Sequence, residues 1–214
     1  MIPAREAFRR LRDGNRRFVD NLRHPENLHL SDSQRAALAK SQEPHAIVLG
    51  CSDSRAPAEL IFDQGLGDLF VIRVAGNIVA PSQIGSVEFA AAQFHTPLVV
   101  VLGHSQCGAV RASLEHLRSG SHNPSPNIRF IVSRVGQAIE RTVAEAPAGE
   151  DPEALMRRAV RANVANSTHK LRHRSAVLQR QARLAGLVVV GAEYSIESGA
   201  VEFFDGVPAD WAAD

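Results

Sequence analysis

Short continuous apolar runs alternate with stretches of helical periodicity along most of the chain. Runs of this kind are typical of strands buried on both faces of a parallel sheet, and the amphipathic stretches are typical of the helices that cover such a sheet. Five runs predict strands at 46–49, 69–74, 97–102, 187–190 and 201–204. The last two are joined through Ser198-Gly199, a turn that predicts an antiparallel hairpin at the edge of the sheet.

Between these runs, the spacing of the apolar residues predicts helices. They cover 4–21, a short segment capped at 31–33 that ends before Pro44, 85–94, 109–117, a segment from Ile128 to Ile139, and a long stretch from Pro152 to about Leu184. Loops are expected at 120–126 and 146–152. We therefore predict an α/β fold: a mainly parallel sheet flanked by helices, with an antiparallel C-terminal edge strand and an N-terminal helical arm. No repeat or boundary interrupts the pattern, so we expect a single domain over 1–214.

Charge and cysteine content narrow the class of protein. The 24 basic and 23 acidic side chains are dispersed and give a net charge of +1, so we expect no nucleic-acid partner. No run of 18 apolar residues occurs, so we expect no membrane partner. Residues 1–14 lack the apolar core of a signal peptide, and this favours a cytoplasmic protein. A reducing compartment would keep the two cysteines as thiols, available for a metal or for chemistry.

Both cysteines lie in motifs that directly follow predicted strands. Cys51 follows the first strand, and His104-Ser-Gln-Cys107 follows the third. Ligands of open α/β sheets bind beyond the carboxyl ends of the strands, so the two loops can meet although they are far apart in sequence. Two thiolates and one imidazole are a plausible zinc ligand set that leaves a fourth position for water. Cys51, His104 and Cys107 are therefore the candidate metal ligands.

Asp53 and Arg55 add candidate chemistry beside Cys51. The Asp53 carboxylate can orient a metal-bound water by accepting its hydrogen bond, or it can bind the metal itself and displace the water. Arg55 can hold Asp53 off the metal through a bidentate pair. This spacing predicts a switch between an inactive site, with Asp53 on the metal, and an active one, with Asp53 on Arg55.

Other interpretations of these residues remain open. A lone cysteine is usually a small buried apolar residue, and a lone histidine is more often structural than a ligand. Cys51 and Cys107 could form a thiol redox pair, although no Cys-x-x-Cys motif is present. A closed structural zinc site that includes Asp53 is a further alternative. Arg55 argues against that alternative, since a permanently closed site does not need an arginine to withdraw the carboxylate.

Cys51-Ser-Asp-Ser-Arg55, followed about fifty residues later by His104-x-x-Cys107-Gly, resembles the motifs of the β-class carbonic anhydrases, as does the segment 62–77. The likeness extends over about 4–204. It implies one zinc ion per chain on Cys51, His104 and Cys107, and reversible hydration of CO2 to bicarbonate and a proton. In that reaction, zinc-bound hydroxide attacks CO2 while the Asp53–Arg55 dyad gates the metal. It also implies a homodimer, possibly a tetramer, with 1–40 as a helical dimerisation arm.

The resemblance also assigns a substrate pocket. Gln42 stands where plant-like members have a glutamine that reaches the partner's active site and binds substrate. Phe70 and Ala75 fall where the family has apolar walls of the CO2 pocket, and Phe89 replaces a tyrosine of the plant members. Relatives with a similar site hydrolyse carbonyl sulfide or carbon disulfide, so that activity is the alternative within this resemblance.

A second subtype of the family is inhibited by bicarbonate at a site that uses a tryptophan, an arginine and a tyrosine. Arg73 matches the arginine and Tyr194 is a candidate for the tyrosine, but Val48 stands at the tryptophan position. Arg73 could instead be a strand residue paired with a carboxylate. We therefore expect the plant-like subtype, with little or no inhibition through that site.

Overall fold

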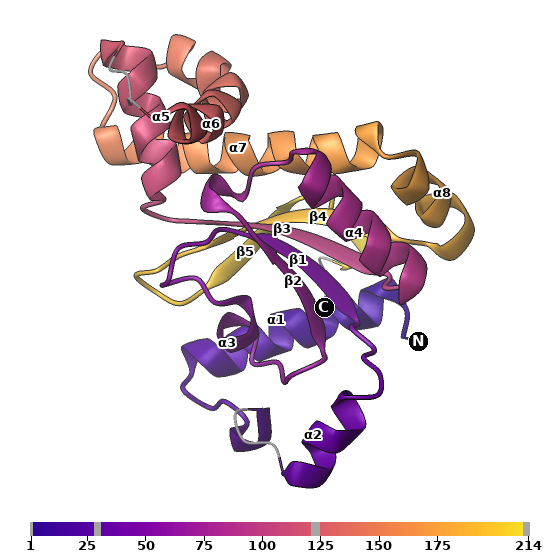
Figure 1. Ribbon diagram of the computed structural model, residues 1–214. Coiled ribbons are helices and arrows are strands. Elements are labelled where there is room, and N and C mark those ends of the chain that lie inside the picture. The colour runs from indigo at the N-terminus through magenta and orange to yellow at the C-terminus, as the bar shows by residue number, and fades with distance from the viewer. Residues whose placement is uncertain (1, 28–30, 121–124, 212–214) are drawn as a thin grey trace.

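Five strands form one mixed sheet with the order β2-β1-β3-β4-β5 (Figure 1). A computed structural model describes residues 2–27, 31–120 and 125–211, so most of the loop expected at 120–126 lies outside the described residues. The strands are β1 (Ala46–Gly50), β2 (Leu69–Arg73), β3 (Leu98–His104), β4 (Val188–Tyr194) and β5 (Val201–Asp205). The first four are parallel, and β5 pairs antiparallel with β4 at the edge. The predicted mainly parallel sheet and its antiparallel edge are confirmed.

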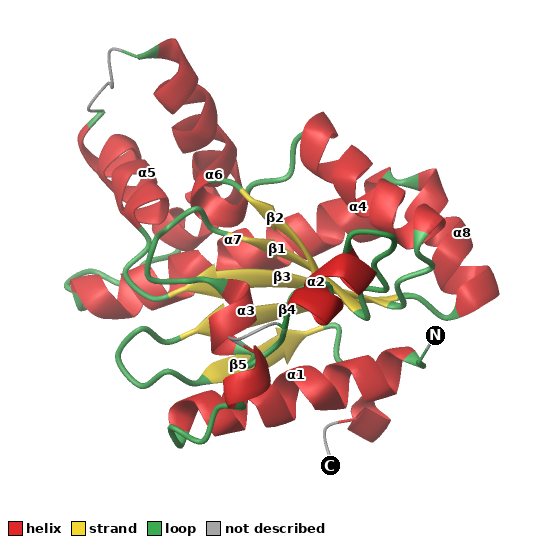
Figure 2. Cartoon of the chain, turned by 60° about the horizontal axis from the view of Figure 1, so that its bottom comes forward, coloured by secondary structure: helices red, strands yellow, loops and turns green. Residues whose placement is uncertain are grey.

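Helices cover both faces of the sheet because alternate strand residues point to opposite sides. On one face, Val100 and Leu102 pack against α1 (Ala4–Val19). On the other, Val99 and Val101 pack against α4 (Pro81–Gln93), α7 (Pro152–Arg174) and α8 (Ala176–Ala185). Figure 2 shows α1 on the opposite side of the sheet from α4 and α8. Burial on both faces therefore explains the continuous apolar runs of the central strands β1 and β3.

A third apolar cluster lies beside the carboxyl ends of the strands. It joins α5 (Gly108–Ser119) and α6 (Pro126–Ala144) to α7, and it includes Cys51 and Cys107 (Figure 1). The short 3₁₀ helix η2 (Ala75–Asn77) contacts α5, α6 and α7. This cluster makes the region around the two cysteines part of the packed interior.

The N-terminal region contains two helices of different character. Helix α1 buries Phe8 and Leu11, whereas α2 (Asp32–Leu38) buries none of its residues. A capping box closes the start of α2: the Ser31 hydroxyl accepts from the Gln34 backbone N–H, and the Gln34 side chain accepts from the Ser31 N–H. Helix α2 ends at Leu38, so the predicted short helix that begins at the Ser31 cap and ends before Pro44 is confirmed.

Other helix boundaries differ from the sequence prediction. Helix α4 begins at Pro81 instead of 85, with the proline in its first turn, where a missing N–H costs nothing. The long stretch to Leu184 is two helices, because Ser175 is extended and its hydroxyl caps α8 by accepting from the Leu178 N–H. That hydroxyl also donates to Glu88 at 2.6 Å, which fixes the break. The short helix α3 (Ala58–Ile61) was not predicted, nor were the 3₁₀ turns η1 (Pro25–Asn27) and η3 (Ala209–Trp211).

Among the described residues, no helix combines the length and the apolar character that crossing a bilayer requires.

A buried carboxylate ties α1 to the segment after α3. The Asp63 side chain is 2% exposed, and it accepts hydrogen bonds from Arg17 Nε at 2.5 Å and from the Asn27 side chain at 3.1 Å. Burial alone would raise the pKa of Asp63, but the hydrogen bonds from Arg17, Asn27 and the His24 backbone N–H outweigh it, and the pKa is lowered. Asp63 is therefore held as a carboxylate in the folded chain.

Gly14 of α1 lies where no side chain fits. A Cβ atom at this position would lie 1.8 Å from the Phe62 carbonyl oxygen. We expect Gly14→Ala to lower the free energy of unfolding by about 1–3 kcal/mol, the usual cost of overpacking. Gly136→Ala in α6 is the control, because no described atom lies within 4 Å of its added Cβ. It should be neutral or stabilising by up to about 1 kcal/mol. Urea unfolding at matched concentration measures both, and equal effects would contradict this packing.

Asp63→Asn tests the buried carboxylate. We expect a loss of about 1–3 kcal/mol in the free energy of unfolding at neutral pH, because charged hydrogen bonds are lost. The pKa of Asp63 is lowered on folding, so its stabilisation is present above the unfolded value of about 4 and disappears as the pH falls through the folded value. The difference between wild type and variant should therefore narrow below about pH 4. A difference that widens toward acid, in urea unfolding of the metal-free protein, would be inconsistent with this assignment.

Candidate metal and active site

Parallel pairing brings the two sequence motifs together at the carboxyl ends of neighbouring strands. Strands β1 and β3 are neighbours in register, with Gly50 opposite Leu102. Cys51 directly follows β1, His104 is the last residue of β3, and Cys107 is the N-cap of α5. Gln106 has a φ of 55°, and this positive value turns the chain sharply between His104 and Cys107. The three candidate ligands thus reach the same place from two strand ends and a helix start.

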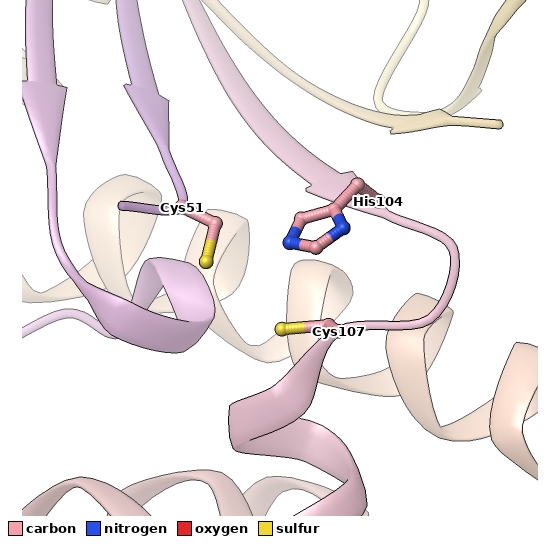
Figure 3. Close-up of side chains that lie close together, drawn as sticks. All are labelled: Cys51, His104 and Cys107. Carbon is pink, nitrogen blue, oxygen red and sulfur yellow. The ribbon is translucent and has the colours of Figure 1, made fainter. Parts of the chain in front are cut away.

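The side chains of Cys51, His104 and Cys107 point toward one another (Figure 3). Their sulfur and ring nitrogen atoms all lie within 4.8 Å of one another, and all three residues are buried. No other group of three or more such side chains is found among the described residues. The arrangement is of the size that one metal ion would occupy.

The histidine is held in the form that binds a metal. Its Nδ1 lies 2.8 Å from the Ser105 carbonyl oxygen, and since a carbonyl can only accept, Nδ1 carries the proton. In the neutral ring, Nε2 then has a free lone pair. This Nε2 atom is buried and has no hydrogen-bond partner among the residues that the structure describes. A buried nitrogen without a partner is costly, and a metal ion between the two sulfurs would satisfy it. The residues present therefore fit a zinc ion.

The two sulfur atoms interact strongly in the metal-free chain. The hydrogen bond from Cys107 lowers the pKa of the Cys51 thiol, although burial opposes this, and the same bond raises the pKa of Cys107. The Gly76 N–H also donates to Cys51 Sγ, at 3.3 Å, which favours the thiolate. Gly76 has a φ of 67°, and an added Cβ would lie 3.0 Å from Ala109, so the position suits only glycine. The centre thus holds negative charge in a buried place.

Asp53 and Arg55 form a bidentate pair beside this centre. Arg55 Nε donates to Asp53 Oδ1 at 2.9 Å, and Nη2 donates to Oδ2 at 2.8 Å. The Arg55 backbone N–H also donates to Oδ1. The side-chain bond to Arg55 holds the pKa of Asp53 well below its usual range. Asp53 Oδ2 is 3.9 Å from His104 Nε2. The carboxylate is therefore ionised, held by the arginine, and next to the candidate metal position.

Arg73 braces the loop that carries Cys51 and Asp53. It ends β2 opposite Gly50, and it donates to the carbonyl oxygens of Cys51 at 2.9 Å and of Asp53 at 2.6 Å. The sequence suggested a bicarbonate contact or a carboxylate partner for this arginine, but the bonds it makes are to the backbone. The sequence alone does not reveal these backbone bonds, because they depend on the strand register, which places Arg73 beside the end of β1.

The predicted pocket residues are divided between two places. Ala75 begins η2, directly before Gly76, and so lies beside the candidate centre. Phe70 and Phe89 pack against each other at the β2–α4 edge, with ring centroids 6.2 Å apart. Gln42 precedes β1, whose five residues span about 16 Å, so it lies toward the opposite end of that strand from Cys51. Of these four residues, one chain therefore brings only Ala75 to the candidate metal-binding loops.

Known proteins resemble this chain in both sequence and structure. A family model described as carbonic anhydrase matches residues 46–201. Carbonic anhydrase 2 of Mycobacterium tuberculosis is 37% identical over 193 residues, 90% of this chain and 89% of that protein. A carbonic anhydrase of Mycolicibacterium smegmatis is 47% identical over 135 residues, 62% of this chain and 63% of that one. A structure reported among two tetrameric β-carbonic anhydrases of Sordaria macrospora covers 79% of this chain and 85% of its own, with a TM-score of 0.72 and 25% identity.

The chain therefore belongs to the β-class carbonic anhydrase family. The resemblance carried by the two motifs is confirmed, and so is the enzyme class. The family supports CO2 hydration as the reaction.

Proposed function

We propose that this protein catalyses the reversible hydration of CO2 to bicarbonate and a proton, using one zinc ion held by Cys51, His104 and Cys107. The observation that carries the proposal is the buried Nε2 of His104, which has no hydrogen-bond partner among the described residues and belongs to a cluster, within 4.8 Å, with the Cys51 and Cys107 sulfurs. A carboxylate held by an arginine lies beside this cluster. Membership of the family and the buried ligand set support the same chemistry.

A zinc ion bound there would act as a Lewis acid: it would lower the pKa of a water molecule and so make that water a better nucleophile. The two thiolates offset much of the charge of the ion, so help from the protein is needed to orient the attacking water. Asp53 is placed to accept a hydrogen bond from that water, because its carboxylate is ionised and faces the same space as His104 Nε2. Arg55 keeps the carboxylate in this position.

The same pair acts as a gate in our proposal. If Asp53 left Arg55 and turned toward the cluster, it would supply a fourth ligand and exclude water. The bidentate bonds from Arg55 oppose that movement, and Arg55 Nη2 is itself held by the Gln106 carbonyl oxygen at 3.3 Å. Asp53 on Arg55 is the arrangement in this structure, and we assign it to the active form.

The substrate pocket is proposed to form between two copies of the chain. Gln42, Phe70 and Phe89 gather on the β2 side, where β2 has an unpaired edge and Phe89 is 55% exposed. An exposed edge and an exposed aromatic side chain favour covering by another subunit. We propose that this face supplies the three side chains to the partner's site, and that Ala75 lines the chain's own. Helix α2, with no buried residue, is proposed as part of the 1–40 dimerisation arm.

We further propose the plant-like subtype, in a homodimer or a tetramer. The position of the inhibitory tryptophan holds Val48, which is fully buried in the core, and the guanidinium of Arg73 is bonded to two carbonyl oxygens. Neither residue is then available to bind bicarbonate away from the metal. Thiol ligands require reducing conditions, which supports a cytoplasmic location.

The gate is tested by stopped-flow CO2 hydration of zinc-loaded variants. We expect Asp53→Asn to lower kcat/KM by about 100-fold or more while zinc stays bound, since a positioned proton acceptor contributes factors of this size. Arg55→Lys should also be slow, because the bidentate pair is lost. Arg141→Ala, which breaks an exposed pair with Glu145 on α6, is the control and should match the wild type. Hydration at the wild-type rate by Asp53→Asn would remove Asp53 from the mechanism.

Sharing of sites between subunits is tested by mixing two inactive variants. Gln42→Ala should bind zinc but hydrate CO2 slowly, and Cys107→Ala should lack zinc but keep Gln42. In a mixed dimer, the intact metal site of the first chain would receive Gln42 from the second. We expect the mixture, after exchange of subunits, to regain part of the wild-type activity, up to about one site in four for random pairing. Activity that only averages the two separate variants would contradict the shared pocket.

A further inference from the structure

Ser105, between two candidate metal ligands, is tied to the turn that joins β4 to β5. Its N–H donates to the Tyr194 carbonyl oxygen at 2.9 Å. Its hydroxyl oxygen accepts from the Ile196 N–H at 2.9 Å and donates to Glu197 Oε2 at 2.7 Å. Because Ile196 contributes an N–H, which can only donate, the hydroxyl proton is free to bind the carboxylate. Three hydrogen bonds thus fix one residue of the metal-binding loop from the last hairpin.

Glu197 receives these bonds as a charged group. The hydroxyl of Ser105 lowers the pKa of Glu197, and the positive charge of Arg55 acts in the same direction. The Ser195 hydroxyl donates to the same oxygen at the longer distance of 3.2 Å. A hydrogen bond to an ionised carboxylate is roughly twice as strong as one between neutral groups. The contact from Glu197 to Ser105 is therefore the strongest side-chain link between this hairpin and the metal-binding loop.

The carbonyl of Ser105 sets the protonation state of His104. It accepts the Nδ1 proton at 2.8 Å, and this leaves Nε2 as the nitrogen that faces the two sulfurs. If the carbonyl moved away, the neutral ring could place its proton on Nε2 instead, where it would block a metal. Partners of this kind in the outer shell of a metal site commonly change metal affinity by about 10–100-fold when they are removed.

We propose that Glu197 is a positioning residue for the metal centre: through the Ser105 hydroxyl it holds the carbonyl that keeps His104 protonated on Nδ1. This rests on the proposed function, because the metal is the one proposed there. The two ends of the link are 92 positions apart in the sequence. Glu197 thereby influences the metal site indirectly, through Ser105, because its own hydrogen bond is to Ser105 and not to a candidate ligand.

The hairpin does not need this link for its own structure. Ser195 N–H donates to the Ala200 carbonyl oxygen, Gly199 N–H donates to the Ser195 carbonyl oxygen, and Ser198 N–H donates to the Ser195 hydroxyl. Glu197 is exposed, and with Ser105 it lines a cavity of about 260 Å³. Truncating either side chain therefore leaves the apolar core untouched. Ser195→Ala is the matched control, because it also removes a hydroxyl bonded to Glu197 and loosens the turn, but it does not touch Ser105.

The test compares Glu197→Ala and Ser105→Ala with Ser195→Ala and wild type. Chelator competition gives the zinc affinity, and the ¹⁵N shifts of the His104 ring, recorded for metal-free protein at alkaline pH, give its tautomer. We expect the first two variants to bind zinc about tenfold more weakly or worse, with the proton of His104 distributed between both ring nitrogens. Glu197→Gln should lose less, because its amide oxygen still accepts from Ser105. The thermal midpoints of the metal-free variants should not fall below that of Ser195→Ala.

The outcomes separate this inference from the proposed function. If wild type binds zinc and hydrates CO2 while Glu197→Ala keeps the affinity and the Nδ1 tautomer, the inference is wrong and the proposed function stands. If wild type binds no zinc, the proposed function fails. The ring shifts of the metal-free variants still decide whether Glu197 positions His104, and an unchanged Nδ1 tautomer in both truncations would overturn that role.

Discussion

The parallel pairing of β1 with β3 is the constraint on which the candidate site depends. It brings Cys51 and His104 together at the carboxyl ends of the two strands, although they are 53 positions apart in the sequence. Cys107 joins them through one tight turn after His104. In a parallel sheet, a shift of one residue would reverse which face every side chain meets. Burial of Val99, Val100 and their neighbours on both faces therefore fixes the register and the distance between the candidate ligands.

Around this frame, the backbone and a few long side chains set the chemistry. Arg73 fixes the carbonyl oxygens on either side of the Cys51 loop, and Gly76 approaches the Cys51 sulfur with its N–H. These groups carry positive charge or partial positive charge beside the cysteines, which offsets part of the cost of burying a thiolate. Arg55 does the same for Asp53, so that the ionised carboxylate stays next to the centre without entering it.

The strands and the clustering of Cys51, His104 and Cys107 could be predicted because their signals are local. Apolar runs mark β1 and β3, and each motif begins where a run ends. Other features are decided by contacts between distant segments. The break at Ser175 depends on Glu88, a residue on another helix, and periodicity across the break continues unchanged. Helix α3 is a single turn, too short for any pattern to show.

Part of the candidate site could not be predicted from the sequence, because it also depends on contacts between distant segments. The bond from Ser105 to Glu197 joins two loops whose polar residues look ordinary in the sequence. The division of the pocket residues follows from the strand direction, since Gln42 stands before β1 and Cys51 stands after it. A sequence motif supplies the residue types, whereas the sheet decides which of them meet within one chain.

The central claim is that Cys51, His104 and Cys107 hold one zinc ion. X-ray absorption at the zinc edge, on protein loaded with one equivalent, tests it most directly, with Cys107→Ala as the comparison. We expect a first shell of two sulfur and two nitrogen or oxygen atoms, and loss of stoichiometric zinc in the variant. A shell of nitrogen and oxygen alone, or an unchanged spectrum for Cys107→Ala, would contradict it.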